Sequence, residues 1–406
     1  MREKKEIVVM KFGGTSVGDA DKIRRVADRI IATAEGGKYV VVTVSAMGDT
    51  TDRLIDLASE VTDDPSRREM DMLLSTGEQV SVAILTMAIH KKGHPCISLT
   101  GIQAGISTDD TYSNAKILSI RADRVLKELK KGNIVVIAGF QGSNSEGNIT
   151  TLGRGGSDTT AVAVASVLKA DYCEIYTDVD GVFSTDPNLV EEASKMHSLS
   201  YDEMLELASS GAKILHLRAV EFAKKHDVVL HVRSSFNNNE GTWVMDESKI
   251  DKRMEKPLIT GVTYDTNQVK ISVFELEDRP GIAASLFKEF AENDINIDLI
   301  VQNVSEKNFA AISLTIKNED LAIAKKVLDK LGKKHVEIDP DISKISIVGA
   351  GMQTHPGVAA RMFGLLAEKQ INIEMISTSP IRISCVIRKG RTREAVKVLH
   401  QGFDID

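Results

Sequence analysis

Across residues 7–244, short β-branched runs alternate with longer amphipathic stretches. The runs predict strands at residues 7–10, 39–44, 95–99, 134–138, 172–176 and 228–232. Between the first two runs, residues 19–35 place aliphatic side chains on one helical face, and Asp19 is the expected N-cap. This alternation predicts an α/β fold with a largely parallel central sheet. Ligands of such sheets bind beyond the carboxyl ends of the strands.

An internal repeat follows a charged connector at residues 246–256. Residues 279–287 and 355–363 read RPGIAASLF and HPGVAARMF, and residues 291–298 and 367–374 match in the same register. The repeat predicts two copies of one small β-α-β module. In each copy a Pro-Gly turn and an Ile-Asn-Ile segment supply backbone amides and an amide side chain for a small ligand.

The repeat and the α/β pattern together divide the chain into three domains. We place the first at residues 1–248 and the two modules at residues 258–335 and 336–406. The strand at residues 258–265 is compatible with either module. With 406 residues the chain is long enough for about two to three domains with full cores.

The run LGRGGSDTT at residues 152–160 is the clearest sign of chemistry. Its three glycines let backbone N–H groups approach a ligand, and the Ser, Asp and Thr beside them open a helix whose N-terminus attracts anions. The Rossmann fingerprint would need glycine where Asp158 stands, and the P-loop string does not occur in the chain. The run therefore predicts a phosphate-binding loop of another kind.

Two further strand-end loops belong with this run. At residues 11–16, KFGGTS places a lysine ammonium beside two glycines, so that both can hold the same phosphate. The loop YTDVDGVFSTDPN does not match a calcium-binding EF-hand, because Phe183 and Leu189 stand where that motif needs Gly and Glu. It is better suited to hold an adenosine, with Phe183 against the base. Two anion loops in one α/β domain indicate phosphoryl transfer.

Composition and charge narrow the class of protein. A formal net charge of −7 with interspersed charges argues against a nucleic-acid surface. Cys96, Cys173 and Cys385 lie far apart among apolar residues, which predicts buried free thiols in a reducing compartment and no metal site. No apolar run is long enough for a signal peptide or a membrane span. We expect a cytoplasmic protein that binds neither nucleic acid nor membrane.

Taken in order, the motifs resemble the amino acid kinase family, most closely its members that phosphorylate aspartate and carry two ACT domains. The resemblance covers essentially the whole chain and rests on residues 11–16, 44–48, 75–78, 151–160 and 177–181 and on the paired modules. It implies an amino-acid-kinase domain followed by two ferredoxin-like α+β ACT modules. It also implies transfer of the ATP γ-phosphate, with Mg2+, to the aspartate β-carboxylate. That carboxylate is already ionised at pH 7, so positioning and charge neutralisation would suffice.

The resemblance carries residue roles with it. Lys11 would stabilise the transferring phosphoryl group, Asp158 would organise Lys11, Glu78 would bind the substrate ammonium and Arg154 its α-carboxylate. The residues implied on the nucleotide side are Lys11, Phe12, Gly13, Gly14, Ser16, Thr177, Asp178, Phe183 and Lys213. Those implied around aspartate are Ser45, Thr51, Glu78, Arg154, Gly155, Gly156 and Ser157.

For the paired modules, the resemblance implies feedback control by lysine, by threonine or by both. The implied effector residues are Asp278, Asn296, Asp298, Gln302, Thr354, Val358, Ala359, Asn372, Ile373, Thr378 and Ser379. In the repeat register Asp278 corresponds to Thr354 and Gln302 to Thr378, so only the first copy offers a carboxylate for an effector's ammonium. We expect Asp278, Asn296 and Gln302 to form the tighter site. Paired ACT modules also imply a homodimer or tetramer, with a shorter C-terminal subunit as an additional option.

Two alternatives and two departures remain. A related kinase would act on glutamate, N-acetylglutamate or UMP, but the paired modules and the STGE string at residues 75–78 favour aspartate. An amino-acid sensor with an inactive kinase domain would be expected to lack Lys11 or Asp158, and both are present. Phe183 stands where many relatives have tyrosine, and Asn188 where many have arginine. We assign Asn188 no role.

Overall fold

The computed structural model describes residues 5–212, 214–250, 258–277, 279–304, 309–332 and 335–405. The chain divides into two compact units, which are considered one at a time. The first comprises Met1–Val182, Lys195–Ala208 and Lys213–Asp251, and the second comprises Phe183–Ser194, Ser209–Ala212 and Lys252–Asp406. Two short segments from within the first 248 residues are therefore part of the C-terminal unit.

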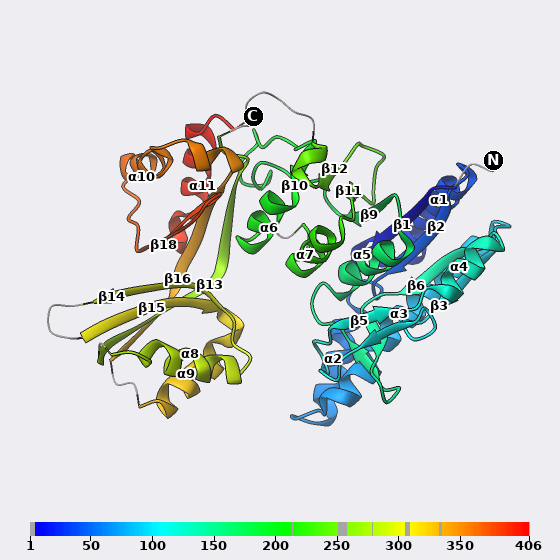
Figure 1. The fold of residues 1–406 in the computed structure, drawn as a ribbon, viewed down its shortest axis with the longest axis horizontal. Coiled ribbons are helices and arrows are strands. Elements are labelled where there is room, and N and C mark those ends of the chain that lie inside the picture. Colours follow the sequence, from blue (N-terminus) through cyan, green and yellow to red (C-terminus); the bar gives the residue numbers. More distant parts are fainter. Residues whose placement is uncertain are drawn as a thin grey trace. The chain divides into compact units, whose positions relative to one another are not determined.

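A largely parallel eight-stranded sheet forms the middle of the first unit (Figure 1), as predicted. Its order is β10-β12-β11-β9-β1-β2-β6-β3, in which β12 runs antiparallel to β11 and the other neighbours are parallel. The strands are β1 Ile7–Phe12, β2 Tyr39–Val44, β3 Cys96–Leu99, β6 Ile134–Ala138, β9 Tyr172–Thr177, β10 Ser198–Ser200, β11 Leu230–Ser234 and β12 Thr242–Met245. The strand expected at residues 228–232 begins two residues later than the sequence pattern suggested.

Helices and a small second sheet complete this unit. The helices are α1 Ala20–Glu35, α2 Thr50–Val61, α3 Arg67–Lys91, α4 Asp123–Lys130, α5 Gly156–Leu168, α6 Tyr201–Ser209 and α7 Leu217–His226. The four-stranded sheet has the order β5-β4-β7-β8, formed by β4 Ile106–Thr108, β5 Ile117–Ile120, β7 Gln141–Ser143 and β8 Ile149–Thr151. Asp19 caps α1 as predicted, because its carboxylate accepts a 2.8 Å hydrogen bond from the Lys22 backbone N–H.

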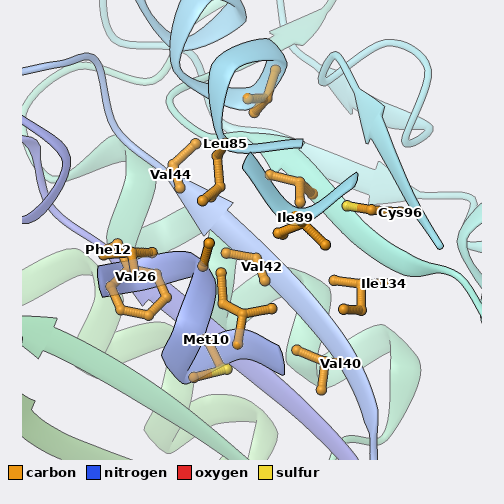
Figure 2. Packing of buried hydrophobic residues seen from close by; sticks show 14 of the residues in the cluster. Met10, Phe12, Val26, Val40, Val42, Val44, Leu85, Ile89, Cys96 and Ile134 are labelled. Carbon is orange, nitrogen blue, oxygen red and sulfur yellow. The ribbon is translucent and has the colours of Figure 1, made fainter. Parts of the chain in front are cut away.

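The core of the first unit explains why the central strands are apolar throughout. Figure 2 shows alternate residues of β1 and β2, among them Met10 and Val42, packed with side chains of α1 and α3. Val9 and Val41 point to the opposite face of the sheet and are just as completely buried. Both faces of the sheet are therefore covered, as in other parallel sheets. The three cysteines are free and buried, as the sequence predicted.

One helix among the described residues, α3, is long and apolar enough to cross a membrane by length and composition alone. Half of its most apolar window is buried inside the protein. Val82, Leu85 and Ile89 of α3 belong to the core, and the carboxylates of Asp71 and Glu78 are buried as well. The core of the first unit thus accounts for one face of α3, whereas Met72, Val80, Ile84 and Met87 of the same helix are exposed.

The second unit is built on a six-stranded antiparallel sheet with the order β14-β15-β13-β16-β18-β17. Its elements are β13 Gly261–Glu277, α8 Ile282–Glu292, β14 Ile297–Val304, β15 Phe309–Lys317, α9 Leu321–Lys330, β16 Val336–Val348, α10 Val358–Glu368, β17 Met375–Ser379, β18 Arg382–Arg388 and α11 Thr392–Gly402. Two large cores form, one around Phe290 and Ile312 and the other around Met362 and Leu399, and a smaller cluster contains Leu299. The duplicated module predicted from the repeat is present.

The repeated Pro-Gly turns have the same backbone geometry in both copies. Gly281 precedes α8 with φ +94°, and Gly357 precedes α10 with φ +97°. Both values lie in the left-handed region that glycine adopts without strain. The repeat in the sequence is therefore also a repeat in backbone conformation.

The segment at residues 258–265 packs with the second copy. Gly261 to Asp265 pair with the last part of β16, and Ile259 and Val262 join the core around Met362. The Val262 backbone N–H donates a 2.7 Å hydrogen bond to the Ser184 carbonyl, and Ser184 Oγ lies 2.9 Å from His400 Nε2. These contacts explain why Phe183–Ser194 is grouped with the C-terminal unit.

Candidate active site

The glycine run turns sharply into α5. Gly153 has φ +74° and Gly155 φ +69°, so both occupy the left-handed region. A Cβ atom on Gly155 would lie 2.0 Å from His216 Cγ, which only glycine avoids. The helix begins at Gly156 and carries Asp158 in its first turn, as the sequence predicted. Ser157 is buried at the same helix start.

Lys11 and Asp158 meet between the two glycine-rich elements. Lys11 lies near the end of β1, and its Nζ is 2.5 Å from Asp158 Oδ1, with each side chain 13% exposed. Gly13 and Gly14 follow directly, and a Cβ on Gly13 would lie 3.5 Å from Lys11 Nζ. A partly buried ammonium is thus held beside glycine amides, next to the positive end of α5. This arrangement suits a phosphate that must be neutralised.

Glu78 lies in α3 and contacts the loop that follows β2. It is 3% exposed, its Oε1 accepts a 3.1 Å hydrogen bond from the Ala46 N–H, and its Oε2 is buried without a hydrogen-bond partner. Burial raises the pKa of Glu78 to about 7. Ser45 precedes Ala46 and Thr51 lies in the first turn of α2, both half-buried. A desolvated carboxylate with one free oxygen is a suitable site for a substrate ammonium.

The remaining residues expected around aspartate differ in exposure. Arg154 is exposed, and Gly156 is buried, with a Cβ position 2.8 Å from a ring carbon of Phe140. Ser157 Oγ would lie 2.7 Å from a Cβ on Gly139, so the loop after β6 passes close to the helix start. The exposed guanidinium next to these tightly packed positions has the freedom to reach a ligand.

The expected nucleotide residues are only partly brought together. The ring of Phe12 is buried and stacks on Tyr176 at 4.6 Å, so only its backbone is available to a ligand. Ser16 is buried, with its Oγ 2.5 Å from Ser235 Oγ. Thr177 donates a 3.0 Å hydrogen bond to Asp178, which is exposed at the end of β9, the neighbour of β1.

Two expected nucleotide residues cannot be placed with that group. Phe183 is half-buried and is counted with the C-terminal unit, and Lys213 lies outside the described residues. Over the described part of the chain, no three His, Cys, Asp or Glu side chains gather as a candidate metal site.

Three residues near the site were not found from the sequence. His216 is half-buried against Gly155, and burial lowers its pKa. Asp71 and Arg218 both contact the segment that leads into the glycine run. The one signal available for Asp71 was its place seven residues before Glu78, on the same face of a long helix.

The expected effector residues of the first ACT copy lie around β14. Asn296 and Gln302 are exposed, and Asp278 lies outside the described residues. Asp298 forms an ion pair with Lys344, whose side chain is completely buried. The carboxylate of Asp298 is thus engaged by the protein itself.

In the second copy, the position equivalent to Asp298 is occupied by Glu374, which forms ion pairs with Lys270 and Arg388. Thr354, Asn372 and Thr378 are exposed, Ala359, Ile373 and Ser379 are half-buried, and Val358 is buried. Both copies therefore hold a paired carboxylate just after the Ile-Asn-Ile segment.

Comparison with known proteins assigns these features to a family. Residues 6–234 match the amino acid kinase family, and residues 271–335 and 345–403 match two models of ACT domains. The chain belongs to the amino acid kinase family. The aspartokinase of Geobacillus stearothermophilus is 49% identical over 399 residues, covering 98% of this chain and 97% of that protein. The aspartokinase of Mycobacterium tuberculosis is 48% identical over 406 residues, covering 98% and 96%.

Solved structures agree with this placement. The structure of Escherichia coli aspartokinase III in complex with aspartate and ADP (R-state) has a TM-score of 0.83 at 26% identity, covering 98% of this chain and 99% of that one. The same enzyme in complex with lysine and aspartate (T-state) has a TM-score of 0.78 at 26% identity, covering 98% and 100%. Within its family, the chain is an aspartate kinase, an ATP-dependent phosphotransferase with a carboxylate acceptor. The expectation that the chain is an aspartate kinase is confirmed.

Proposed function

We propose that the chain transfers the γ-phosphate of ATP to the β-carboxylate of L-aspartate. A β-carboxylate oxygen forms the new bond to phosphorus, the bond from phosphorus to the β,γ-bridging oxygen breaks, and 4-phospho-L-aspartate and ADP leave. The observation that carries this proposal is the Lys11 to Asp158 contact of 2.5 Å between two glycine-rich elements. A relative whose structure holds aspartate and ADP supports it. The reaction would begin the synthesis of lysine, threonine and methionine.

The proposed chemistry needs no general base, because the attacking carboxylate is already ionised. Lys11 and the N–H groups of Gly13 and Gly14 neutralise the phosphoryl group as it moves, and Asp158 restrains Lys11. Mg2+ bound to the phosphates of ATP would add to this neutralisation. For the adenosine side we propose Phe12, Ser16, Thr177 and Asp178, which lie in the first unit, while Phe183 and Lys213 are assigned to it by the family pattern alone.

Aspartate is recognised through its second carboxylate and its ammonium. Arg154 binds the α-carboxylate through its planar fork, and Glu78 binds the ammonium. Ser45, Thr51 and Ser157 add polar contacts, and Gly155 and Gly156 allow the backbone to approach. The free oxygen of buried Glu78 supports this assignment.

Trapping of the acyl phosphate tests the proposal directly. Hydroxylamine converts aspartyl phosphate to a hydroxamate, which should form only with both ATP and aspartate, and not with glutamate, N-acetylglutamate or UMP as acceptor. Lys11→Met should abolish the signal, whereas Lys92→Met, which removes an exposed helix-end lysine paired with Asp28, should retain it. A folded wild-type enzyme that forms no aspartyl hydroxamate would contradict the proposal.

We further propose feedback inhibition by lysine, threonine or both at the ACT modules, with Asp278, Asn296 and Gln302 as the tighter site. A relative whose structure holds lysine supports this regulation. Asp278→Ala should weaken inhibition, with Thr354→Ala as the matched change in the second copy. Unchanged inhibition by each pathway amino acid in Asp278→Ala would refute it.

Assembly and location follow the same reasoning from the family. We propose a cytoplasmic homodimer or tetramer formed through the ACT modules. Sedimentation analysis with and without the effector tests the assembly. Immunoblotting of a cell extract for a shorter C-terminal polypeptide tests whether a second subunit is also made.

A further inference from the structure

The carboxylate of Asp71 is completely buried in α3 and accepts several hydrogen bonds at once. The Ser113 backbone N–H lies 3.0 Å from both of its oxygens, and Ser113 Oγ donates at 3.3 Å. The Thr151 backbone N–H donates at 2.8 Å and Thr151 Oγ1 at 2.7 Å. An ionised carboxylate has enough lone pairs for this set of donors, whereas an amide has one oxygen and would turn its own NH2 group toward them.

Asp71 joins two segments that are distant in the sequence. Ser113 has φ +67°, an uncommon conformation for a residue other than glycine, and its carbonyl lies 3.0 Å from the Cβ position of Gly153. The Ala115 N–H donates a 2.9 Å hydrogen bond to the Thr151 carbonyl. By bonding Ser113 and Thr151 together, Asp71 fixes the loop against which the glycine run turns.

Arg218 holds the same two segments from α7. Its guanidinium donates to the Leu152 carbonyl at 2.7 Å and to the Ala115 carbonyl at 2.6 Å. Asp71 therefore takes the N–H groups of these segments and Arg218 their carbonyl groups. Together the two side chains therefore satisfy backbone N–H and C=O groups of the residues that lead into the glycine run.

We propose that Asp71 and Arg218 are positioning residues that set the place of Arg154 for aspartate. This inference rests on the proposed function, in which Arg154 binds the α-carboxylate. Neither residue is assigned a contact with substrate. Their effect passes through Thr151 and Leu152, the residues just before Gly153 and Arg154.

We call Asp71 and Arg218 together the clamp. Its loss should weaken the binding of aspartate more than the binding of ATP. Arg154 follows Thr151 by three residues, on the turn itself. Asp158 follows by seven and lies in the first turn of α5, where the Thr159 N–H donates to the Gly155 carbonyl at 3.0 Å. The hydrogen bond of the next residue and the ion pair with Lys11 tie Asp158 to α5 and β1, so that loosening at Thr151 should displace Arg154 first.

Steady-state kinetics of Asp71→Asn test this separation. We expect the KM for aspartate to rise by about tenfold, because a small displacement of a binding group has effects of this order. The KM for ATP should change by less than about twofold. Glu128→Gln is the matched control, since Glu128 is a buried helix carboxylate whose partners Lys131 and Asn133 lie away from the glycine run. It should leave both KM values unchanged.

Thr151→Val provides a second variant should Asp71→Asn not fold. It removes one donor to Asp71, keeps the shape of the side chain, and should raise the KM for aspartate by a smaller factor in the same direction. Equal changes in both KM values, or a loss of thermal stability with both KM values unchanged, would overturn the inference.

Amide hydrogen exchange separates failure of the clamp from failure of the proposed function. Exchange in residues 110–116 and 150–156 should accelerate in Asp71→Asn and not in Glu128→Gln, whether or not the enzyme phosphorylates aspartate. If the wild type forms no aspartyl hydroxamate, the proposed function fails, while these exchange rates still decide whether Asp71 orders the loop. Unchanged exchange in both segments would refute the clamp.

Discussion

Replacing Glu78 by glutamine should make the ligand-free enzyme more stable while impairing its function. Burial raises the pKa of Glu78 from 4.5 to about 7, a difference that corresponds to about 3 kcal/mol. Because the folded pKa is the higher one, the free energy of unfolding falls as the pH rises from about 4.5 to about 7. Glutamine does not titrate, so Glu78→Gln should be more stable than the wild type by up to about 3 kcal/mol near pH 8.

The same pKa predicts how aspartate binding depends on pH. If the ionised Glu78 carboxylate binds the substrate ammonium, the KM for aspartate should rise by about tenfold between about pH 8 and about pH 6, as the carboxylate is protonated. In Glu78→Gln the KM should be high and nearly independent of pH. Burial lowers the pKa of His216, which also lies near the site, so its titration shifts further below neutral pH and away from that of Glu78.

Urea unfolding without ligands and steady-state kinetics across this pH range measure both effects. Glu128→Gln is the control for the sign, because Lys131 lowers the pKa of Glu128 and removal of that charge should destabilise the protein. A Glu78→Gln enzyme that is less stable than the wild type near pH 8 would refute the buried-charge argument. An unchanged KM profile would refute the role in binding the ammonium.

Three further substitutions address other parts of the molecule. Arg154→Lys should raise the KM for aspartate more than that for ATP, measured by steady-state kinetics, because lysine lacks the planar fork. Gly155→Ala places a Cβ 2.0 Å from His216 Cγ at φ +69°. It should lower the free energy of unfolding by about 1–3 kcal/mol in urea unfolding, with partial recovery on adding His216→Ala. Asp298→Asn leaves the buried Lys344 ammonium without its ion-pair partner and should cost about 3–5 kcal/mol in urea unfolding, which Lys344→Met should largely restore.

The central strands could be predicted because their sequences are rich in β-branched residues, which favour buried strands. β2 and β6 are nearly continuous β-branched runs and β1 begins with one, as is typical of strands buried on both faces of a parallel sheet. The four-stranded sheet was not predicted, since β4, β7 and β8 have three residues each, too few for a periodic pattern.

The sequence also did not predict that Phe183–Ser194 belongs to the C-terminal unit. Ser184 lies 2.9 Å from His400, which is 216 residues away in the chain. No local pattern reports such a contact. A domain boundary inferred from composition is therefore a single point in the sequence, whereas a packed unit can include segments from either side of that point.

Site residues could be predicted where they belong to a short sequence motif. Lys11 and Asp158 each lie in a glycine-rich motif, and the structure brings them into contact. Asp71 and Arg218 gave much less signal, because their partners are mainly backbone groups between 42 and 103 residues away. Any residue type supplies a backbone N–H or C=O, so side-chain identity at the partner position carries no information.

The helix α3 shows why composition alone misleads at a functional site. By length and hydropathy it is a candidate membrane span, yet it carries two buried carboxylates seven residues apart on one face. Asp71 is satisfied by hydrogen bonds from the protein, whereas Glu78 keeps one oxygen without a partner and has a raised pKa. The satisfied carboxylate stabilises the loop, and the unsatisfied one costs stability that a bound ammonium would recover. An acid in an apolar core helix therefore indicates function most strongly where the fold leaves it incompletely bonded.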